Sequence, residues 1–186
     1  GKVYKQRYEK GKVMYPLKVV GDCEAEKTGT KVTFLPDDTI FEETVFEYDI
    51  LRQRFREMAF LTKGLKISLT DLRGEEEKKE VFHYEGGIKE FVEYLNKSKT
   101  PLYDNIIYCE GVKDNVMVEV AMQHNDSFTD NTYGFVNNIT TPEGGTHVVG
   151  FRNAITKTFN DYARKNKLLK DSEPNLTGED IREGLT

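Results

Sequence analysis

The spacing of apolar residues changes at Glu47, and this change constrains the fold more than any other feature of the sequence. Before it, apolar and aromatic side chains alternate with polar ones over residues 2–8 and 31–35, and residues 17–20 form a short apolar run. A period of two is typical of β-strands, so three successive strands are predicted. Three strands with nothing to cover their apolar face cannot form an independent domain. We therefore expect the chain to begin inside a larger sheet.

From Glu47 onward the apolar side chains recur at helical spacing. Three helices are predicted, beginning at Tyr48, after Gly86-Gly87 and after Gly144-Gly145. Strands are predicted at 65–69, 81–84, 106–109, 116–122 and 132–137. The segment from about residue 43 is thus expected to be a mixed α/β domain in which helices cover one face of a sheet. Near the end, TGED at 177–180 predicts the N-cap of one more helical turn.

Composition excludes several classes of protein. Of the 186 residues, 37% are hydrophobic and 32% are charged, which is too apolar for a disordered chain. No apolar run approaches the ~20 residues that a membrane helix needs, and no signal peptide is visible. The net charge of −5 argues against a protein that is basic throughout and wraps nucleic acid. We expect a soluble, cytosolic protein with no membrane partner.

The familiar catalytic and metal-binding motifs are missing from the sequence. His83, His124 and His147 have no ligand-type neighbour at metal-binding spacing, and Cys23 and Cys109 lie far apart. No Ser-His-Asp signature, Walker loop or G-x-G-x-x-G is present. We therefore predict no metal ligand and no catalytic residue in this stretch. The EEEKKE run at 75–80 is interpreted as a solvated hairpin tip.

The third predicted helix accumulates positive charge in an otherwise acidic chain. Its basic residues are Arg152, Lys157, Arg164, Lys165 and Lys167. One interpretation is a strip that contacts phosphates. The other is an ordinary helix with polar outer faces and cations near its C-terminus, where they favour the helix dipole. The pattern alone leaves both open, and nothing in it marks Thr30 of Thr28-Gly29-Thr30 as special.

Five strings of the sequence are similar to one known family. They are EKTGTKVTFLPD at 26–37, REMAFLTKG at 56–64, FHYEGGIKEFVEYLNKSKTP at 82–101, NNITTPEGGTHVVGFRNAIT at 137–156 and TGEDIREGLT at 177–186. They resemble the ATPase subunits of bacterial type II DNA topoisomerases, most closely the gyrase B family. The resemblance is collinear and covers essentially the whole chain.

The resemblance implies an α+β or α/β architecture in two parts. Residues 1–42 correspond to the last strands of an incomplete GHKL-type ATPase domain. Residues 43–186 correspond to a transducer domain with a fold like that of ribosomal protein S5, a mixed sheet with helices on one face, short of its final strand and helix. The predicted opening strands without a covering layer agree with this division.

Three site residues are implied by the resemblance alone. Thr30 matches the family threonine that helps to hold the adenine of ATP through an ordered water and also contacts aminocoumarin inhibitors. Val32 matches an apolar residue of the same pocket. Arg152 matches an arginine that faces the cavity through which a DNA segment passes. A hydroxyl with an ordered water can read an adenine edge, and an arginine suits sequence-independent phosphate contact.

The implied activity is ATP-driven DNA topology change, namely negative supercoiling. ATP and Mg²⁺ are the implied cofactors of the parent protein. Its implied partners are a second copy of itself, double-stranded DNA and the A subunit of gyrase, in the bacterial cytoplasm at the nucleoid. The family's catalytic glutamate, magnesium-binding asparagine and Q-T-K lysine lie outside these residues. The 186 residues alone are therefore expected not to hydrolyse ATP or to bind it tightly.

Three alternatives remain. The equivalent subunit of topoisomerase IV, a decatenating enzyme, shares the same strings. A stand-alone nucleic-acid-binding module with an S5-like fold would lack enzymatic activity and would bind duplex DNA with a steep salt dependence. Another GHKL relative, such as a mismatch-repair ATPase or a chaperone, is disfavoured by HYEGGI and EGGTHxxGFR.

Overall fold

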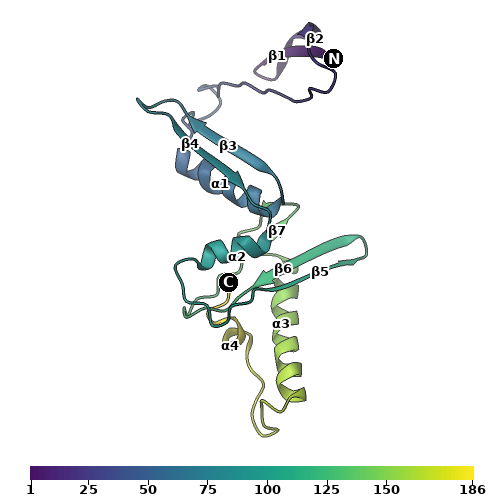
Figure 1. Ribbon diagram of the computed structural model, residues 1–186, viewed down its shortest axis with the longest axis vertical. Coiled ribbons are helices and arrows are strands. Elements are labelled where there is room, and N and C mark those ends of the chain that lie inside the picture. The colour runs from purple at the N-terminus through teal and green to yellow at the C-terminus, as the bar shows by residue number, and fades with distance from the viewer. The chain divides into compact units, whose positions relative to one another are not determined.

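The computed structural model describes residues 1–186 and contains two compact units, Gly1–Glu47 and Tyr48–Thr186. Figure 1 labels the helices and strands of each unit. The elements confirm a mixed α+β chain built from small sheets and helices. None of the helices combines the length and the apolar character needed to cross a membrane.

Unit 1 is one β-hairpin followed by a long irregular segment. Strand β1 (Lys2–Glu9) pairs antiparallel with β2 (Lys12–Asp22) around a turn in which Lys10 and Gly11 both have positive φ. Unit 1 contributes no buried hydrophobic residue, because the buried hydrophobic side chains begin at Ala59. The hairpin is therefore held mainly by its backbone ladder.

The strand predicted at 31–35 does not form. These residues are irregular and exposed, although apolar and polar side chains alternate along them. A strand needs a neighbouring strand to satisfy its N–H and C=O groups, and none pairs with this segment. The stop predicted after it does form: the Asp37 side chain accepts from Thr39 N, and Asp37 O accepts from Ile40 N and Phe41 N.

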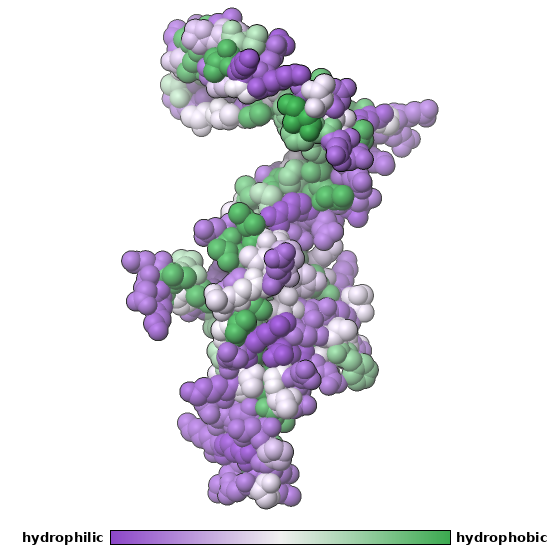
Figure 2. Space-filling model, turned by 180° about the vertical axis from the view of Figure 1, so that it is seen from behind, coloured by the Kyte–Doolittle hydropathy of each residue, from purple (hydrophilic) through white to green (hydrophobic).

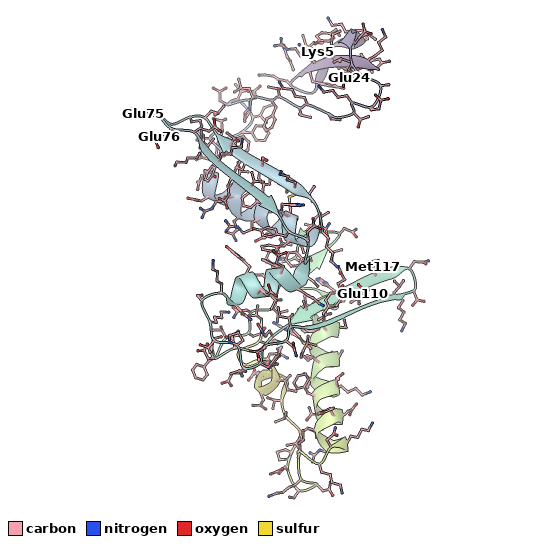
Figure 3. All side chains as sticks on the ribbon, viewed as in Figure 1. Lys5, Glu24, Glu75, Glu76, Glu110 and Met117 are labelled. Atoms are coloured by element: carbon pink, nitrogen blue, oxygen red, sulfur yellow. The ribbon has the colours of Figure 1, made fainter.

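In unit 2, helix α1 (Tyr48–Leu61) packs on a hairpin made of β3 (Lys66–Asp71) and β4 (Lys78–His83). Figure 1 shows the helix lying along one face of this hairpin. Ala59, Leu69 and Phe82 form the buried centre of this contact. This confirms the helix and both strands predicted here. Glu75 and Glu76 lie exposed at the outer end of the hairpin, as predicted for a solvated tip (Figure 3).

Helix α2 (Ile88–Asn96) joins α1 through an aromatic cluster. Phe60 is 1% exposed; its ring stacks on Tyr84 at 3.6 Å between centroids and on Phe91 of α2 at 5.0 Å. Gly87 precedes the helix with φ of 64°, a conformation that favours glycine. The predicted start after Gly86-Gly87 is confirmed.

The remaining strands form two more hairpins. Strand β5 (Ile107–Lys113) pairs with β6 (Val116–Met122), and β7 (Phe135–Val136) pairs with β8 (Ile139–Thr140). Both two-residue turns have positive φ at both positions, as type I′ hairpins require. Figure 3 shows Glu110 and Met117 on the projecting β5–β6 hairpin.

The structure differs from the predicted sheet in two details. The strands form four separate two-stranded antiparallel sheets and do not join into one mixed sheet. Of the strand predicted at 132–137, only β7 is formed. The loop before it is bonded elsewhere, because Asn125 N donates to Gly184 O and Asn131 N donates to Leu185 O. Sequence periodicity gives no sign of that competing partner.

Helix α3 (Thr146–Lys165) and the short helix α4 (Gly178–Arg182) share the second core. Ile155, Ile181 and Leu185 are its buried residues, and Phe151 and Phe159 pack against it. Thr177 caps α4, which confirms the predicted TGED cap. Figure 2 shows mainly hydrophilic side chains at the lower end of unit 2, where α3 ends and the loop to α4 begins.

Candidate functional site

Thr30 and Val32 lie in the irregular segment of unit 1. Both are exposed, Val32 to 77%. They do not line the open hollow of about 540 Å³ in this unit, which is formed by Val3, Asp22, Cys23, Glu24 and Lys27. Both side chains are therefore open to solvent in unit 1.

Arg152 lies in unit 2, on the second turn of α3, and reaches a loop that the sequence analysis did not single out. Its Nη2 donates to Asp130 Oδ2 at 3.1 Å, and the side chain is 43% exposed. Its Nε is the only buried side-chain nitrogen or oxygen atom without a hydrogen-bond partner. The guanidinium is therefore positioned but not fully satisfied.

Arg182 of α4 approaches the same carboxylate. Its Nε donates to Asp130 Oδ2 at 3.0 Å, and its side chain is only 16% exposed. One carboxylate oxygen thus serves two guanidinium groups. Two positive charges against one negative charge leave a local excess of one positive charge.

A pocket of about 430 Å³ opens beside these arginines, between α3 and the segment that leads into α4. Its lining comprises Arg152, Asn153, Thr156, Lys157, Asn160, Asp161, Asn175, Leu176, Gly178 and Arg182. Three of these residues are basic and one is acidic. The pocket is therefore polar and net positive within a chain that is negative overall.

Hydrogen bonds from side chains of α3 hold the loop that forms one wall of this pocket. Asn160 donates through Nδ2 to Leu176 O at 2.9 Å and accepts from Leu176 N at 2.8 Å. Arg164 donates to Asn175 Oδ1 at 3.0 Å and to the Glu173 carbonyl. These contacts fix the loop between the two helices against α3.

The structure divides the basic residues of α3 between the two interpretations. Arg152 and Lys157 line the pocket, and Lys157 has no ion-pair partner. Arg164 is committed to holding the loop, and Lys165 lies in the last helical turn. Because Arg164 is bonded to the loop, the basic residues of this helix do not form one continuous strip of free cations.

Sequence reasoning missed Asp130 and Arg182. Arg182 stands in the TGEDIREGLT string, but the string carried no role for it. The capping box was the only signal that α4 would begin where it does, and α4 is what turns Arg182 toward α3. Nothing in the sequence links Asp130 to Arg152 or Arg182, which lie 22 and 52 positions further along the chain.

The three histidines have structural neighbours. His83 lies 3.1 Å from Glu85, and His147 Nε2 lies 2.9 Å from Thr141 Oγ1. His124 is held between the Tyr103 hydroxyl and the Ile181 carbonyl, each at 2.8 Å. His124 thus ties the 101–104 segment to α4.

Comparison with known proteins places these features in a family. A profile of the DNA gyrase B family matches residues 87–186, more than half of the chain. The DNA gyrase B protein of Halalkalibacterium halodurans is 56% identical over the whole chain, which covers 29% of that relative. The DNA topoisomerase 4 B protein of Enterococcus faecalis is 54% identical, also over the whole chain, which covers 27% of that relative.

A solved structure agrees with these sequence relatives. The 43K ATPase domain of Thermus thermophilus gyrase B, determined in complex with an aminocoumarin, matches with a TM-score of 0.82 and 37% identity. The match covers the whole of this chain and 50% of that one. The chain belongs to the DNA gyrase B family. It spans less than a third of the length of the two sequence relatives described above.

Proposed function

We propose that the protein is the ATPase subunit of a gyrase-type DNA topoisomerase. It would couple ATP binding and hydrolysis to dimerisation, DNA capture and strand passage, with negative supercoiling as the result. The observation that carries this proposal is 56% identity over the whole chain to a gyrase B relative. Similarity to a gyrase B ATPase domain at a TM-score of 0.82 supports it.

The proposal gives one role to each of two parts of the chain, divided after residue 42, five residues before the boundary between the two compact units. We assign residues 1–42 to the end of a GHKL ATPase domain and residues 43–186 to most of an S5-like transducer. A transducer of this kind acts as a rigid element whose orientation changes with the bound nucleotide, a population shift driven by differential binding. The two packed cores of unit 2 support this assignment.

Site roles follow from this assignment. Thr30 would help to hold the adenine and Val32 would line the same pocket, with ATP and Mg²⁺ as cofactors of the full-length protein. No group of three His, Cys, Asp or Glu residues lies close enough to hold a metal ion. The family resemblance places the catalytic glutamate and the magnesium-binding asparagine outside these residues, and on that ground we expect no ATP turnover by residues 1–186 alone.

The remaining roles concern partners and location. Arg152 would face the cavity that a DNA duplex passes through. The partners would be a second copy of the protein, double-stranded DNA and the A subunit of gyrase, in the cytoplasm at the nucleoid.

Topoisomerase IV is the second candidate, because the Enterococcus faecalis topoisomerase 4 relative is 54% identical to this chain. That identity is too close to 56% to separate the two enzymes. The full-length protein, reconstituted with its DNA-cleaving partner protein, separates them by product. Negative supercoiling of relaxed plasmid supports gyrase, whereas decatenation without supercoiling supports topoisomerase IV.

The proposal is tested by ATP turnover of the full-length protein as a function of its concentration. Turnover that rises faster than linearly is expected, because dimerisation precedes hydrolysis. Thr30→Ala should weaken nucleotide binding about 5- to 10-fold, the effect of losing one hydrogen bond worth about 1 kcal/mol. Thr28→Ala, two residues away with the same chemical change, is the matched control and should leave binding unchanged.

Two outcomes would contradict the proposal. Absence of turnover at every concentration, by protein that melts cooperatively, would leave a DNA-binding or scaffolding module as the better assignment. Equal weakening by Thr28→Ala and Thr30→Ala would remove the specific role of Thr30 while leaving the ATPase assignment intact.

A further inference from the structure

A chain of buried amides lies between the two cores of unit 2. The first core is built from α1, β3 and β4, the second from α3, α4 and Leu185, and the two share no residue. Figure 1 shows α2 between α1 and α4. Asn96, the last residue of α2, is 4% exposed, and Gln123 and Asn125 are 4% and 2% exposed. Burial of a polar group costs free energy unless it is hydrogen-bonded, so these amides require partners.

The three amides bond to one another in one direction. Asn125 Nδ2 donates to Asn96 Oδ1 at 3.3 Å, and Asn96 Nδ2 donates to Gln123 Oε1 at 3.0 Å. Gln123 Nε2 then donates to the Tyr103 carbonyl at 2.9 Å. Asn125 Nδ2 also donates to Thr186 Oγ1 at 3.2 Å, next to the second core. The chain therefore runs from the second core through the end of α2 to the 101–104 segment.

Backbone groups at both ends fix this direction. Ser127 N can only donate, and it donates to Asn125 Oδ1 at 3.0 Å, so the Asn125 amide nitrogen is left to face Asn96. The Tyr103 carbonyl can only accept, so Gln123 turns its nitrogen there and its oxygen toward Asn96. Asn96 therefore fits in one orientation, with its nitrogen toward Gln123 and its oxygen toward Asn125.

Such a chain favours one closed arrangement of the two cores. If Asn96 moves away, the Gln123 oxygen loses its donor and the Asn125 amide loses one of its two acceptors, all at buried positions. A shift of α2 by one residue would bring Leu95 or Lys97 to the joint, and neither side chain can both donate and accept. Partial opening is therefore penalised.

Other long-range hydrogen bonds from α1 and the loop after it lead elsewhere. Arg54 Nη1 donates to Thr140 Oγ1 at 2.6 Å, and Asn138 Nδ2 donates to Thr62 Oγ1 at 3.2 Å. Both reach the β7–β8 hairpin, which contributes no residue to the second core. The amide chain is the buried polar connection that reaches residues 184–186.

We propose that the Asn125–Asn96–Gln123 chain couples the two cores of unit 2, so that they open together and change orientation together, with Asn96 as the positioning residue at its centre. Coupling of the cores stands on the contacts within unit 2. Its consequence for strand passage rests on the proposed function.

The test is hydrogen exchange of the 186-residue protein, followed by mass spectrometry on peptides from each core. Asn160→Ala is the probe, because Asn160 is a buried residue of α3 whose side chain bonds only within α3 and to Leu176. If the cores are coupled, this change should speed exchange of β4 in the first core at least about 5-fold. In an Asn96→Ala background it should change β4 exchange less than about 2-fold.

Two further backgrounds sharpen the comparison. Asn153→Ala, the same substitution at an exposed position of α3, is the matched control and should leave the transmitted effect at its wild-type size. Thr186→Val keeps the side-chain shape but removes the hydroxyl that accepts from Asn125, so it should reduce the transmitted effect. This milder variant keeps the test decisive if Asn96→Ala unfolds.

Two exchange results would overturn the proposal. One is equal acceleration of β4 exchange by Asn160→Ala in the wild-type and Asn96→Ala backgrounds, because the coupling would then run elsewhere. The other is no acceleration in the wild type, because the cores would then be independent already.

The full-length protein tests the consequence for function. Asn96→Ala should retain ATP turnover that rises faster than linearly with concentration, while the DNA product formed per ATP falls at least about 3-fold. Unchanged product per ATP would overturn the role of Asn96 in strand passage. Absence of turnover in the wild type would instead contradict the proposed function and leave the exchange result standing.

Discussion

Thr177 and Asp180 close a reciprocal pair of hydrogen bonds at the start of α4. Asp180 N donates to Thr177 Oγ1 at 3.1 Å, and Thr177 N donates to Asp180 Oδ2 at 2.7 Å. The Thr177 side chain is the largest cause that lowers the pKa of Asp180, followed by the Thr177 backbone. Because α4 places Ile181 in the core and Arg182 at the pocket, this cap supports both stability and the site.

We predict that Thr177→Ala lowers the free energy of unfolding by about 1 kcal/mol near neutral pH, the usual cost of losing an N-cap hydroxyl. The folded-state pKa of Asp180 is depressed, so its contribution is present above its ordinary value of 3.8 and is lost as pH falls through the lowered pKa. The difference in the free energy of unfolding between wild type and Thr177→Ala should therefore become smaller in acid. Urea denaturation at a series of pH values measures it.

Thr177→Ser is the matched control, because serine keeps the hydroxyl and should cost only a few tenths of a kcal/mol. A gap between wild type and Thr177→Ala that stays constant down to about pH 2 would show that Asp180 is not linked to the cap.

At the scale of elements, residues 184–186 form a strap that pairs with residues 123–125 and places Leu185 in the second core. Gln123 and Thr186 exchange backbone N–H···O=C bonds of 2.9 and 3.0 Å, and Asn125 N donates to Gly184 O at 2.9 Å. Gly184 has φ of 71°, and an added Cβ would lie within 2.7 Å of the Ser127 carbonyl oxygen. Only glycine fits this position without moving the opposing backbone.

Gly184→Ala should therefore destabilise unit 2 by more than about 1 kcal/mol, because it combines an unfavourable φ with a backbone clash. Gly150→Ala is the contrasting change: Gly150 lies within α3, and an added Cβ meets nothing within 4 Å. That variant should be stabilised by about 0.4–1 kcal/mol. Thermal melting of the two variants compares them, and a Gly184→Ala midpoint equal to that of the wild type would contradict the role of the strap.

The TGED cap formed as predicted, whereas the strand predicted at 31–35 did not form and the strand predicted at 132–137 is reduced to β7, with Asn137 in a turn. The Asp114-Asn115 and Asn137-Asn138 turns adopt positive φ at both positions, which asparagine and aspartate tolerate. The alternation at 31–35 looked equally convincing but produced no strand. A turn is completed by the residues inside it, whereas a strand requires a partner supplied by another segment.

At the scale of the whole molecule, the apolar burial is concentrated in unit 2. Every buried hydrophobic residue lies between Ala59 and Leu185, whereas Val3, Leu17, Phe34 and other apolar residues of unit 1 are exposed. Since burial of apolar surface is the dominant favourable term in folding, unit 2 carries the stability of this chain.

We predict that residues 48–186, without unit 1, melt cooperatively within about 3 °C of the full 186 residues, a change of less than ~1 kcal/mol. Circular dichroism melting measures the midpoint. Residues 1–47 alone should show no cooperative transition, because a lone hairpin is at best marginally stable in water. A drop of about 10 °C or more in the midpoint of residues 48–186 would show that unit 1 stabilises unit 2.

The sequence by itself determined the three long helices, the cap of α4 and the family, because each is encoded by neighbouring residues or by strings that read in order along the chain. Tertiary structure alone decided that the strands form separate hairpins and that residues 184–186 pair with 123–125. It also brought Asp130 to Arg152 and Arg182. The physical reason is range: a cap or turn is satisfied within about four residues, whereas a charge cluster requires folding to bring distant segments together.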